Sequence, residues 1–443
     1  MAAQPQIDAA HVATEVAPVR WNAATRIAFR FCFIYFSLYC LTTQILTGMF
    51  PIPKVDLPDL ASLPPVRNLV IWTSAHVFRI SQPLVYTGSG SGDKTFDWVL
   101  VFCTLSIAAL GAAAWSTIDR KRENYIALHK WFYLFLRFAV GSEMVLYGLV
   151  KVMPMQMPYP FLTKLVEPFG NFSPMGILWF SIGAAPAYER FVGSAELLGG
   201  VLLLLPRTAT FGALICLADA TEIFALNMTY DVPVKLLSFH LILMSILLLA
   251  PELPRIIRFF FSTGAVDAPK RPALFRRRRA NRTAVAVQVV YGLLLVALTA
   301  YGARESYRKF GRLAPTPSLY GIWNVVTMTV DGQVLPPLLT DNERWRRLLV
   351  DIGPRVAFQR PDDSFANYGA SIDDKQGNLE LTKPGDKNWK AVLKFQRASP
   401  DQLTLDGDMD GHRIQMRLSY FDKNKLLLVS RGFHWIQEYP FNR

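Results

Sequence analysis

The sequence predicts a polytopic α-helical membrane protein of about seven spans, followed by an all-β domain at the C-terminus. Three observations support this fold class. Of the 443 residues 51% are apolar, and they gather in runs long enough to cross a bilayer. The Lys and Arg residues that give the net charge of +13 collect between these runs. From residue 315 onward the pattern changes to short alternating stretches separated by Gly, Pro and Asp turn signals.

The chain begins with residues 1–26, which are polar and which we expect to form a cytoplasmic segment. No small-residue cleavage site follows the first apolar run, so we expect that run to stay as an anchor. Residues 27–118 contain two expected spans, about Ile27–Gly48 and Trp98–Trp115, joined by an extracytoplasmic loop. This loop carries a short amphipathic piece near Asn68–Ile80.

The end of the loop is rich in glycine and serine, with the sequence TGSGSGDKTFDW from Thr87 to Trp98. Such a stretch can cradle an anion or can serve as a flexible linker. Because no soluble helix follows, we favour the linker.

Four further apolar runs occupy residues 130–253, and each contains ionisable residues. These expected spans are Trp131–Val152, Phe191–Leu205, Thr208–Met228 and Val234–Leu253. A basic loop, 254–282, includes the run Arg276–Arg279 and precedes a seventh span at 283–302. Residues 315–443 form the appended domain.

Positive charge sets the expected orientation. If the N-terminus is cytoplasmic, the loops after the second, fourth and sixth spans are cytoplasmic too, and these loops hold nearly all the clustered Lys and Arg. Seven spans then place the C-terminal domain outside. We therefore expect a bacterial inner-membrane protein with a periplasmic domain.

Ionisable side chains inside spans are costly in a bilayer, so those of the central spans must be paired, hydrated or functional. Steps of four residues join Glu143, Tyr147 and Lys151 on one helical stripe. Small residues at 193 and 200 flank Glu196 and allow close helix packing. We expect these faces to surround one outward-opening pocket. Its candidate residues are Arg137, Glu143, Tyr147, Lys151, Glu196, Asp219, Glu222 and His240.

Three interpretations of this cluster remain open. In the first, Glu143 or Glu196 pairs with Lys151 or Arg137 to fix the helix register. In the second, the cluster is a polar pocket for a quinone-like or other small ligand, with a carboxylate or His240 as proton donor or acceptor. In the third, the carboxylates carry an ion or small solute, although only Arg137 lies in the inner half.

Three stretches of the central segment share a recognisable pattern: RFAVGSEMVLYGLVK (Arg137 to Lys151), ERFVGSAELLGGVLLLLPRTATFGALICL (Glu189 to Leu217) and the helix before APELPR (Ala250 to Arg255). With them the segment resembles the DoxX family of small four-helix membrane proteins, over roughly residues 130–253. The family is named for a subunit of a thiosulfate:quinone oxidoreductase. The resemblance implies a four-helix core and permits quinone-linked redox chemistry.

The C-terminal domain is predicted to be a closed antiparallel barrel or a sandwich. It opens with GIWNVVTMTVDG after Tyr320, and a helix is expected at Asn342–Val350. The expected strands that follow are Arg355–Gln359, Asn378–Leu381, Trp389–Phe395, Gln402–Leu405, His412–Leu418 and Lys425–Ser430. The turn signals between them are Asp374–Gly377, Pro384–Asp386, Asp406–Asp408 and Asp410-Gly411.

The opening Gly321-x-Trp323, together with Arg431 on an expected late strand, resembles the lipocalin and fatty-acid-binding superfamily. In that superfamily the Trp and the Arg pack together to close one end of the barrel. The resemblance implies a structural role for these residues and a barrel interior that could hold a small apolar ligand. His412 and His434 are expected at the surface or rim.

No nucleophile elbow, H-E-x-x-H, Walker loop or dinucleotide fingerprint occurs in the sequence. The four cysteines lie in apolar runs without a C-x-x-C pair, so no zinc site is expected. The leading hypothesis is a membrane component of a quinone-linked or other redox system. The alternative is a non-enzymatic scaffold or accessory subunit, or a lipid-binding barrel. The expected partners are membrane lipid, membrane-protein subunits or a small apolar ligand, and not nucleic acid.

Overall fold

The computed structural model describes residues 20–55, 57–86, 89–266, 273–338, 343–353 and 355–442. The predictions for residues 1–19, for Thr87 and Gly88, and for Asn342 lie outside the described residues, as do Lys270 and Arg271 of the basic loop. The chain divides into two compact units. The first unit comprises Met1–Thr47, Asp56–Ala139 and Pro254–Val285, and the second comprises Gly48–Val55, Val140–Leu253 and Ala286–Arg443.

The first unit is built around two long apolar helices that pack together. They are α1 (Ala23–Thr42) and α4 (Thr95–Ile118). Asn22 caps the start of α1, where its Oδ1 atom accepts a hydrogen bond from Thr25 N (2.7 Å). Arg30 is buried, and its guanidinium donates to Tyr125 Oη (2.9 Å) and Asp119 O (2.9 Å). The unit also contains η1 (Leu60–Ser62), α3 (Pro64–His76), the first half of α5 (Ile126–Val152), α11 (Leu253–Phe261) and the start of α12 (Arg278–Phe310).

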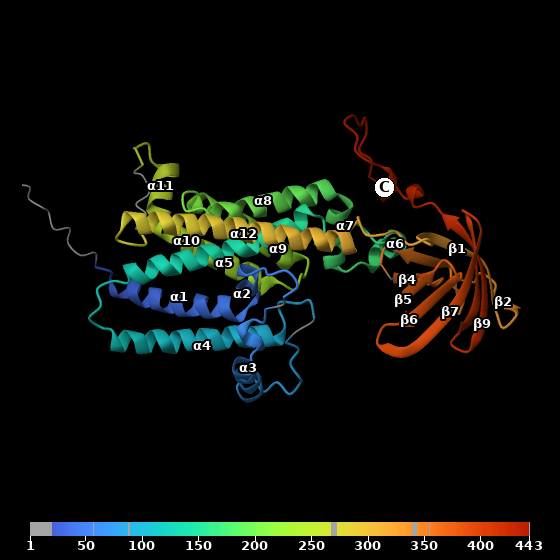
Figure 1. The fold of residues 1–443 in the computed structure, drawn as a ribbon, viewed down its shortest axis with the longest axis horizontal. Coiled ribbons are helices and arrows are strands. Elements are labelled where there is room, and N and C mark those ends of the chain that lie inside the picture. The colour runs from blue at the N-terminus through green and yellow to red at the C-terminus, as the bar shows by residue number, and fades with distance from the viewer. Residues whose placement is uncertain are drawn as a thin grey trace, which may run out of the picture. The chain divides into compact units, whose positions relative to one another are not determined.

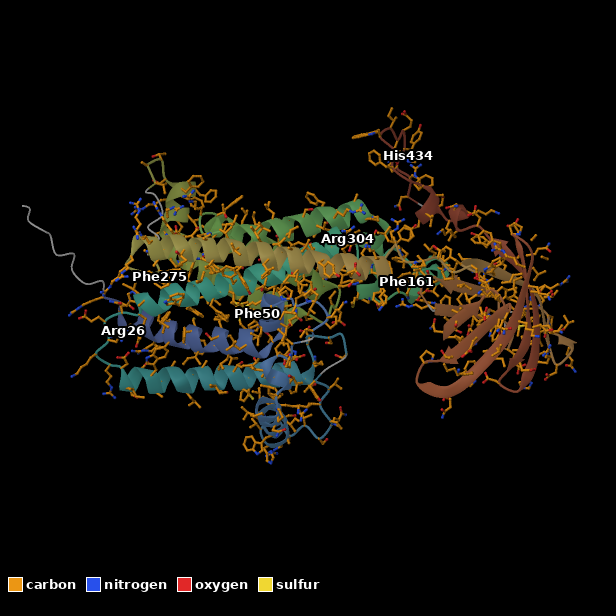
Figure 2. All side chains as sticks on the ribbon, in the orientation of Figure 1. Arg26, Phe50, Phe161, Phe275, Arg304 and His434 are labelled. Atoms are coloured by element: carbon orange, nitrogen blue, oxygen red, sulfur yellow. The ribbon has the colours of Figure 1, made fainter. Side chains whose placement is uncertain are left out.

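α3 corresponds to the amphipathic piece expected in the first loop. It begins with two prolines, whose fixed φ suits a first helical turn. Its buried Val70 packs with Phe96 and Leu100 of α4. At one end of this unit Arg26 donates to Arg122 O (2.6 Å), and Figure 2 labels Arg26 and Phe275 there.

The second unit contains the remaining helices and the C-terminal domain. Its helical elements are α2 (Gln44–Met49, partly), the second half of α5, α6 (Leu162–Val166), η2 (Phe169–Asn171), α7 (Pro174–Ala184), α8 (Pro186–Leu204), α9 (Ala209–Thr229), α10 (Lys235–Leu249), η3 (Ala250–Glu252) and most of α12. α6 and α7 lie between the expected spans Trp131–Val152 and Phe191–Leu205, where the sequence had indicated no element.

Among the described residues, six helices are long and apolar enough to cross a membrane. They are Ala23–Thr42, Thr95–Ile118, Ile126–Val152, Ala209–Thr229, Lys235–Phe261 and Arg278–Phe310. The expected set of several long apolar helices is thus confirmed. α8 has 19 residues but is not in this set, because Glu189, Arg190 and Glu196 lower its apolar character. The expected span at Phe191–Leu205, most of which lies in α8, stays a prediction.

Glycines bring α5 and α8 into close contact. A Cβ atom on Gly148 would lie 2.8 Å from Gly193 O, and one on Gly193 would lie 2.8 Å from Gly148 O. About two helical turns away, Gly141 and Gly200 approach each other in the same way, and a Cβ atom on Gly200 would lie 2.9 Å from Gly141 O. The two helix backbones therefore touch along a small-residue seam, as the sequence predicted for Gly193 and Gly200.

The C-terminal domain is a closed antiparallel barrel (Figure 1). Its strands are β1 (Gly321–Val330), β3 (Arg347–Asp351), β4 (Arg355–Gln359), β5 (Phe365–Asp373), β6 (Asn378–Lys383), β7 (Asp386–Ser399), β8 (Gln402–Met409) and β9 (His412–Phe421), and a short β2 (Gln333–Val334) extends β1 as a hairpin. Each strand pairs with the next, and β9 pairs with β1 to close the ring of eight. The barrel prediction is confirmed.

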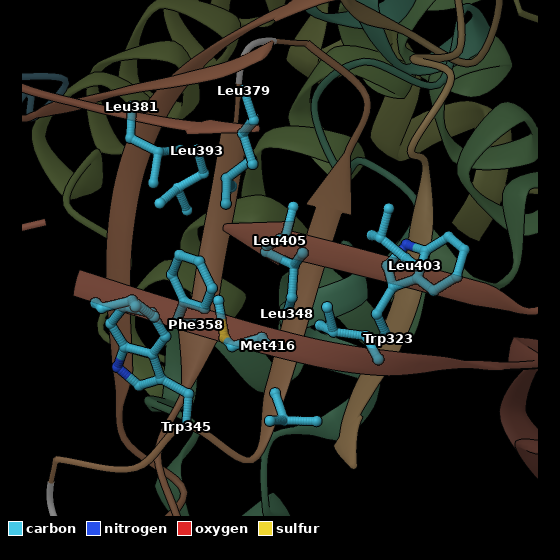
Figure 3. Close-up of a cluster of buried hydrophobic side chains, with 14 of the residues drawn as sticks. Trp323, Trp345, Leu348, Phe358, Leu379, Leu381, Leu393, Leu403, Leu405 and Met416 are labelled. Carbon is cyan, nitrogen blue, oxygen red and sulfur yellow. The ribbon is translucent and has the colours of Figure 1, made fainter. Parts of the chain in front are cut away.

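Side chains fill the barrel interior (Figure 3). Trp323, Phe358 and Leu348 are fully buried there, and Trp345 stacks on Phe358 with ring centroids 4.0 Å apart. Further buried members from the other strands are Leu379, Leu381, Leu393, Leu403, Leu405 and Met416. The interior is thus a packed hydrophobic core, and the expectation of a ligand inside the barrel gains no support.

Two local predictions for this domain are wrong. No helix forms in the described part of the expected helix at 342–350: residues 343–346 are irregular, and strand β3 begins at Arg347, because Leu348 and Val350 enter the barrel core while Leu349 packs on the outer wall. Burial on both faces overrides the local helical preference. The expected strand at 425–430 is η4 (Lys423–Lys425) followed by α13 (Leu427–Ser430), since the barrel already closes at Phe421.

The signal at Asp406–Asp408 does not mark a turn. These residues lie inside β8, where a Cβ on Gly407 would overlap Val392 O of the neighbouring strand. Glycine is needed there for close strand approach. The chain turns instead at Asp410-Gly411, where φ is 53° and 85°.

The expected closure of the barrel by Trp323 and Arg431 is also wrong. Arg431 follows α13, its guanidinium lies 4.3 Å from the Phe441 ring centroid, and it donates to Gln437 Oε1 (3.0 Å). Arg397 of β7 takes the expected place, with its guanidinium carbon 5.5 Å from the Trp323 ring centroid. The cation–π contact therefore exists, but another arginine supplies it. Gly321, at φ 147°, leaves room for the ring of Tyr420.

Candidate functional site

A cavity of about 200 Å³ lies among the helices of the second unit. α5, α7, α8, α9 and α10 line it, together with the residues that directly follow α5. Its apolar lining consists of Met144, Met157, Leu178, Ile182, Val192, Ile223, Leu226, Val234, Leu237 and Leu241. Its polar and aromatic lining consists of Tyr147, Lys151, Gln156, Trp179, Tyr188, Glu196, Glu222, Asn227 and Ser238.

The central polar feature is an ion pair between Lys151 Nζ and Glu196 Oε1. The glycine seam explains its position, since Gly193 packs directly against Lys151 Cβ and holds the last turn of α5 beside α8. Lys151 is 4% exposed and Glu196 is 1% exposed. Taking two charges out of water costs several kcal/mol each, so the pair depends on its mutual attraction. Glu196 Oε2 is also buried and accepts no hydrogen bond from the described residues.

The structure brings together half of the predicted site residues. Tyr147, Lys151, Glu196 and Glu222 line the cavity. Asp219, one turn before Glu222 on α9, lies within electrostatic range of the ion pair without lining the cavity.

The other three predicted residues lie elsewhere. The carboxylate of Glu143 packs against Gly48, where an added Cβ would overlap its Oε1 atom. His240 is buried, and its Nδ1 lies 2.6 Å from Leu236 O, so its ring is hydrogen-bonded to its own helix. Arg137 belongs to the first unit, where its guanidinium lies over the Phe138 ring.

Several cavity residues were not predicted. Asn227 Nδ2 donates to Ser238 Oγ (3.0 Å) and so ties α9 to α10. Met157 N donates a hydrogen bond to Oε1 of Glu189 (3.0 Å), a buried residue outside the cavity lining, and this bond fixes the start of α8 against the segment after α5. Trp179 lies on α7. The signal for α7 was present in the Ser173-Pro174 pair, a capping residue followed by proline at the first helical position.

The segment that lines the cavity also docks on the barrel. Between its cavity residues lies α6, whose Leu162 is buried with Ile322, Leu349 and Ala357 on the outer wall of the barrel. This contact gives the segment 153–188 two attachment points, the cavity and the barrel.

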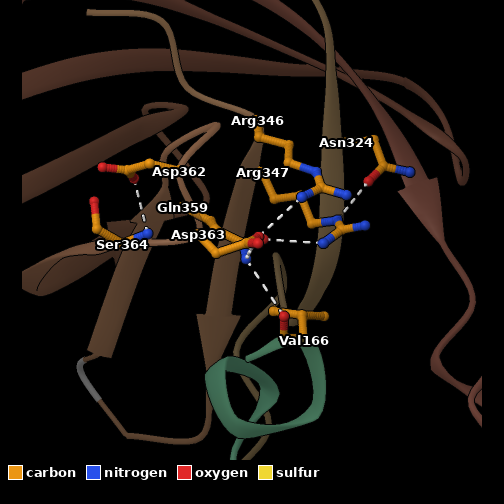
Figure 4. A network of polar contacts seen from close by, with 8 residues as sticks. All are labelled: Val166, Asn324, Arg346, Arg347, Gln359, Asp362, Asp363 and Ser364. Atoms are coloured by element: carbon orange, nitrogen blue, oxygen red, sulfur yellow. Dashed lines mark hydrogen bonds and ion pairs between the residues drawn. The ribbon is translucent and has the colours of Figure 1, made fainter. Parts of the chain in front are cut away.

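Hydrogen bonds hold both ends of α6. Leu162 N donates to Asp351 Oδ2 (2.8 Å), and Gln359 Nε2 donates to Val166 O (3.4 Å), the latter shown in Figure 4. Gln359 is itself fully buried and accepts a hydrogen bond from Arg347 Nη1 (3.0 Å). Burial raises the pKa of the Asp351 carboxyl, and the hydrogen bond from Leu162 opposes this rise.

The cavity combines groups suited to binding a flat amphipathic molecule. An ammonium group and two phenols can donate hydrogen bonds, carboxylates can accept them, and apolar side chains form the remaining walls. The described residues contain no group of three or more His, Cys, Asp or Glu side chains that could hold a metal ion. The hydrogen-bonding and ionisable groups of the lining suit binding and proton exchange.

Comparison with known proteins gives one relative. Over 118 residues, which are 27% of this chain, the sequence is 36% identical to "Uncharacterized protein YwoB" of Bacillus subtilis (strain 168), and the match covers 72% of that protein. No protein-family model and no solved structure matches the chain. The likeness to DoxX proteins and to lipocalins stays a prediction.

Proposed function

We propose that this chain, which belongs to the same protein family as the uncharacterized protein YwoB of Bacillus subtilis (strain 168), is an integral membrane component of a quinone-linked redox system. It binds a quinone-like ligand in the cavity around Lys151 and Glu196. The observation that carries this proposal is a buried ion pair in the wall of a mostly apolar cavity. Burying a charged pair in such a wall costs free energy, and charges kept inside a membrane protein at that cost typically serve a function.

The residues offer a consistent binding arrangement. Lys151 and Tyr147 donate hydrogen bonds to the carbonyl oxygens of the ligand, and Trp179 and Leu241 flank its ring. A quinone takes up two protons with two electrons. Glu196 and Glu222 are the groups placed to exchange those protons, and the electrons come from a redox partner protein.

The same proposal places the chain in a bacterial inner membrane with its N-terminus inside and the barrel in the periplasm. Clustered basic residues at one end of the first unit support this orientation, and hydrogen bonds hold the segments that carry them together there. Arg26 binds Arg122 O, and Lys130 Nζ donates to Ala273 O (2.7 Å) beside the run Arg276–Arg279. Clustered positive charge is typical of the cytoplasmic side.

The barrel supports a second, non-enzymatic role. Its interior is filled by Trp323, Phe358 and their neighbours, so its outer wall is the part available to partners. The barrel then serves as an accessory module that docks subunits of a membrane complex. Such a role is compatible with ligand binding in the helical cavity.

The test is the quinone content of the purified full chain. The protein is extracted in a mild detergent, and retained quinones are quantified by mass spectrometry per mole of protein. Binding of decylubiquinone is then titrated by quenching of tryptophan fluorescence. We expect retained quinone in the wild type, and an affinity for decylubiquinone that is weaker by about tenfold or more in Lys151→Met, because a hydrogen bond from a charged group is lost.

Asp231→Asn is the matched control. Asp231 pairs with Lys235 (3.0 Å), but its side chain is 85% exposed. This variant removes an ion pair from the same helical unit without touching the cavity. A wild type that neither retains nor binds quinone would refute the proposal, as would equal affinities of the wild type and Lys151→Met.

A further inference from the structure

α11 has two chemically opposite faces. Leu253, Ile256, Ile257 and Phe260 recur at the spacing of one helical face. Arg258 lies on the opposite side of the helix. This pattern is typical of a helix that lies in a membrane interface with its apolar side toward the acyl chains.

The apolar face of α11 is uncovered. None of its residues is buried, and the exposed fractions are 64% for Phe260 and 85% for Phe261. Soluble surfaces rarely present adjacent phenylalanines in this way. The apolar stretch Lys235–Phe261, which includes α10 and α11, is long enough to cross a membrane. α11 follows α10 directly after η3 and completes this stretch, so the surface available to its apolar face is the bilayer itself.

A basic cluster accompanies this helix in the first unit. The exposed arginines are Arg276, Arg277, Arg278, Arg279 and Arg282, at the start of α12. Their position is fixed by neighbouring contacts. The rings of Phe275 and Trp131 lie 5.7 Å apart, and Asn281 Oδ1 accepts a hydrogen bond from Phe275 N (2.9 Å).

Both acidic groups of the described connection between α4 and α5 are engaged in contacts. Glu123 pairs with Arg20 (2.6 Å), and Asp119 accepts a hydrogen bond from Tyr125 Oη (2.9 Å). Arg120, Lys121 and Arg122, in the same connection between α4 and α5, are exposed. This end of the first unit therefore carries a strong excess of positive charge.

We propose that α11 and the arginine run Arg276–Arg279 bind the anionic headgroups of membrane phospholipids. The apolar face of α11 inserts among the acyl chains, and the guanidinium groups bind lipid phosphates. A nucleic acid would satisfy the arginines but would leave the phenylalanines uncovered. This inference is independent of the ligand of the helical cavity.

The test compares lipid binding by the purified full chain in a neutral detergent. Native mass spectrometry gives apparent affinities for phosphatidylglycerol and for phosphatidylcholine of equal chain length. We expect a preference for phosphatidylglycerol in the wild type. Removing two arginines, in Arg276→Gln/Arg277→Gln, should weaken phosphatidylglycerol binding by about 25-fold, from about fivefold for each charge. Phe260→Ser should weaken binding of both lipids.

The control is Arg304→Gln/Arg308→Gln, which removes the same charge from the last turns of α12. All four arginines are exposed, so each variant should elute and melt like the wild type. Equal affinity for the two lipids would overturn the proposal. So would an unchanged Arg276→Gln/Arg277→Gln variant, an equal loss in the control, or displacement of phosphatidylglycerol by a DNA duplex of equal charge.

Discussion

Replacing Glu196 by Gln should strongly destabilise the helices of the second unit. The substitution keeps the shape of the side chain but leaves the Lys151 ammonium without its counter-ion at a site that is 4% exposed. Breaking a buried pair on one side costs about 3–5 kcal/mol, whereas an exposed pair contributes about 0–1 kcal/mol. Asp219 and Glu222 remain within electrostatic range of Lys151, so we expect the lower value, about 3 kcal/mol.

The assay is reversible unfolding of the full chain in mixed detergent, followed by circular dichroism. It compares the wild type with Glu196→Gln, Lys151→Met and the double variant, and Asp231→Asn serves as the exposed control. Since the double variant buries no unpaired charge, it should lose less stability than either single variant. A cost below about 1 kcal/mol for Glu196→Gln, equal to that of the control, would show that the pair is not desolvated and would refute this reasoning.

Three further predictions follow from single contacts. Gly193→Ala should lower the free energy of unfolding by about 1–3 kcal/mol in the same assay, because the added methyl group would lie 2.5 Å from Lys151 Cβ of α5. An unchanged stability would mean that α5 and α8 can move apart without cost. Arg397→Met should lower barrel stability by about 0.5–1 kcal/mol through loss of its contact with the barrel-end tryptophan, measured by urea unfolding, whereas Arg431→Met should not. The hydrogen bond to Asp331 raises the pKa of His412 above 6.5, and the same bond holds the pKa of Asp331 below 3.8. The stabilisation by this pair is therefore fully present between these two values. It is lost as pH rises through the pKa of His412 and as pH falls through the pKa of Asp331. In Asp331→Asn, NMR titration should find a lower pKa for His412.

The sequence indicated the membrane helices and the barrel because both have strong periodic signals. It located the site only in part, and the reason is helical geometry. The spacing of four residues predicted that Glu143 and Lys151 share a helical stripe, but eight residues at about 100° each leave Lys151 rotated by about 80° from Glu143. Lys151 consequently faces the cavity while Glu143 faces α2.

Other features depend on contacts between distant segments. The sequence contains many arginines that could have packed on Trp323, and only the three-dimensional structure shows that Arg397 does so. The residues after α5 carry no long apolar run, so Gln156 and Trp179 were not expected in the cavity. Strand β3 forms because both of its neighbours, β1 and β4, are present to pair with it.

The docking of α6 makes the barrel a discontinuous folding unit. A fragment consisting of residues 315–443 would uncover Leu349 and leave the carboxylate of Asp351 without its partner at Leu162. The missing piece is encoded about 150 residues earlier, between segments that line the cavity. Recombination that exchanged barrels between related proteins would therefore have to exchange α6 as well, so these two distant stretches are expected to be inherited together.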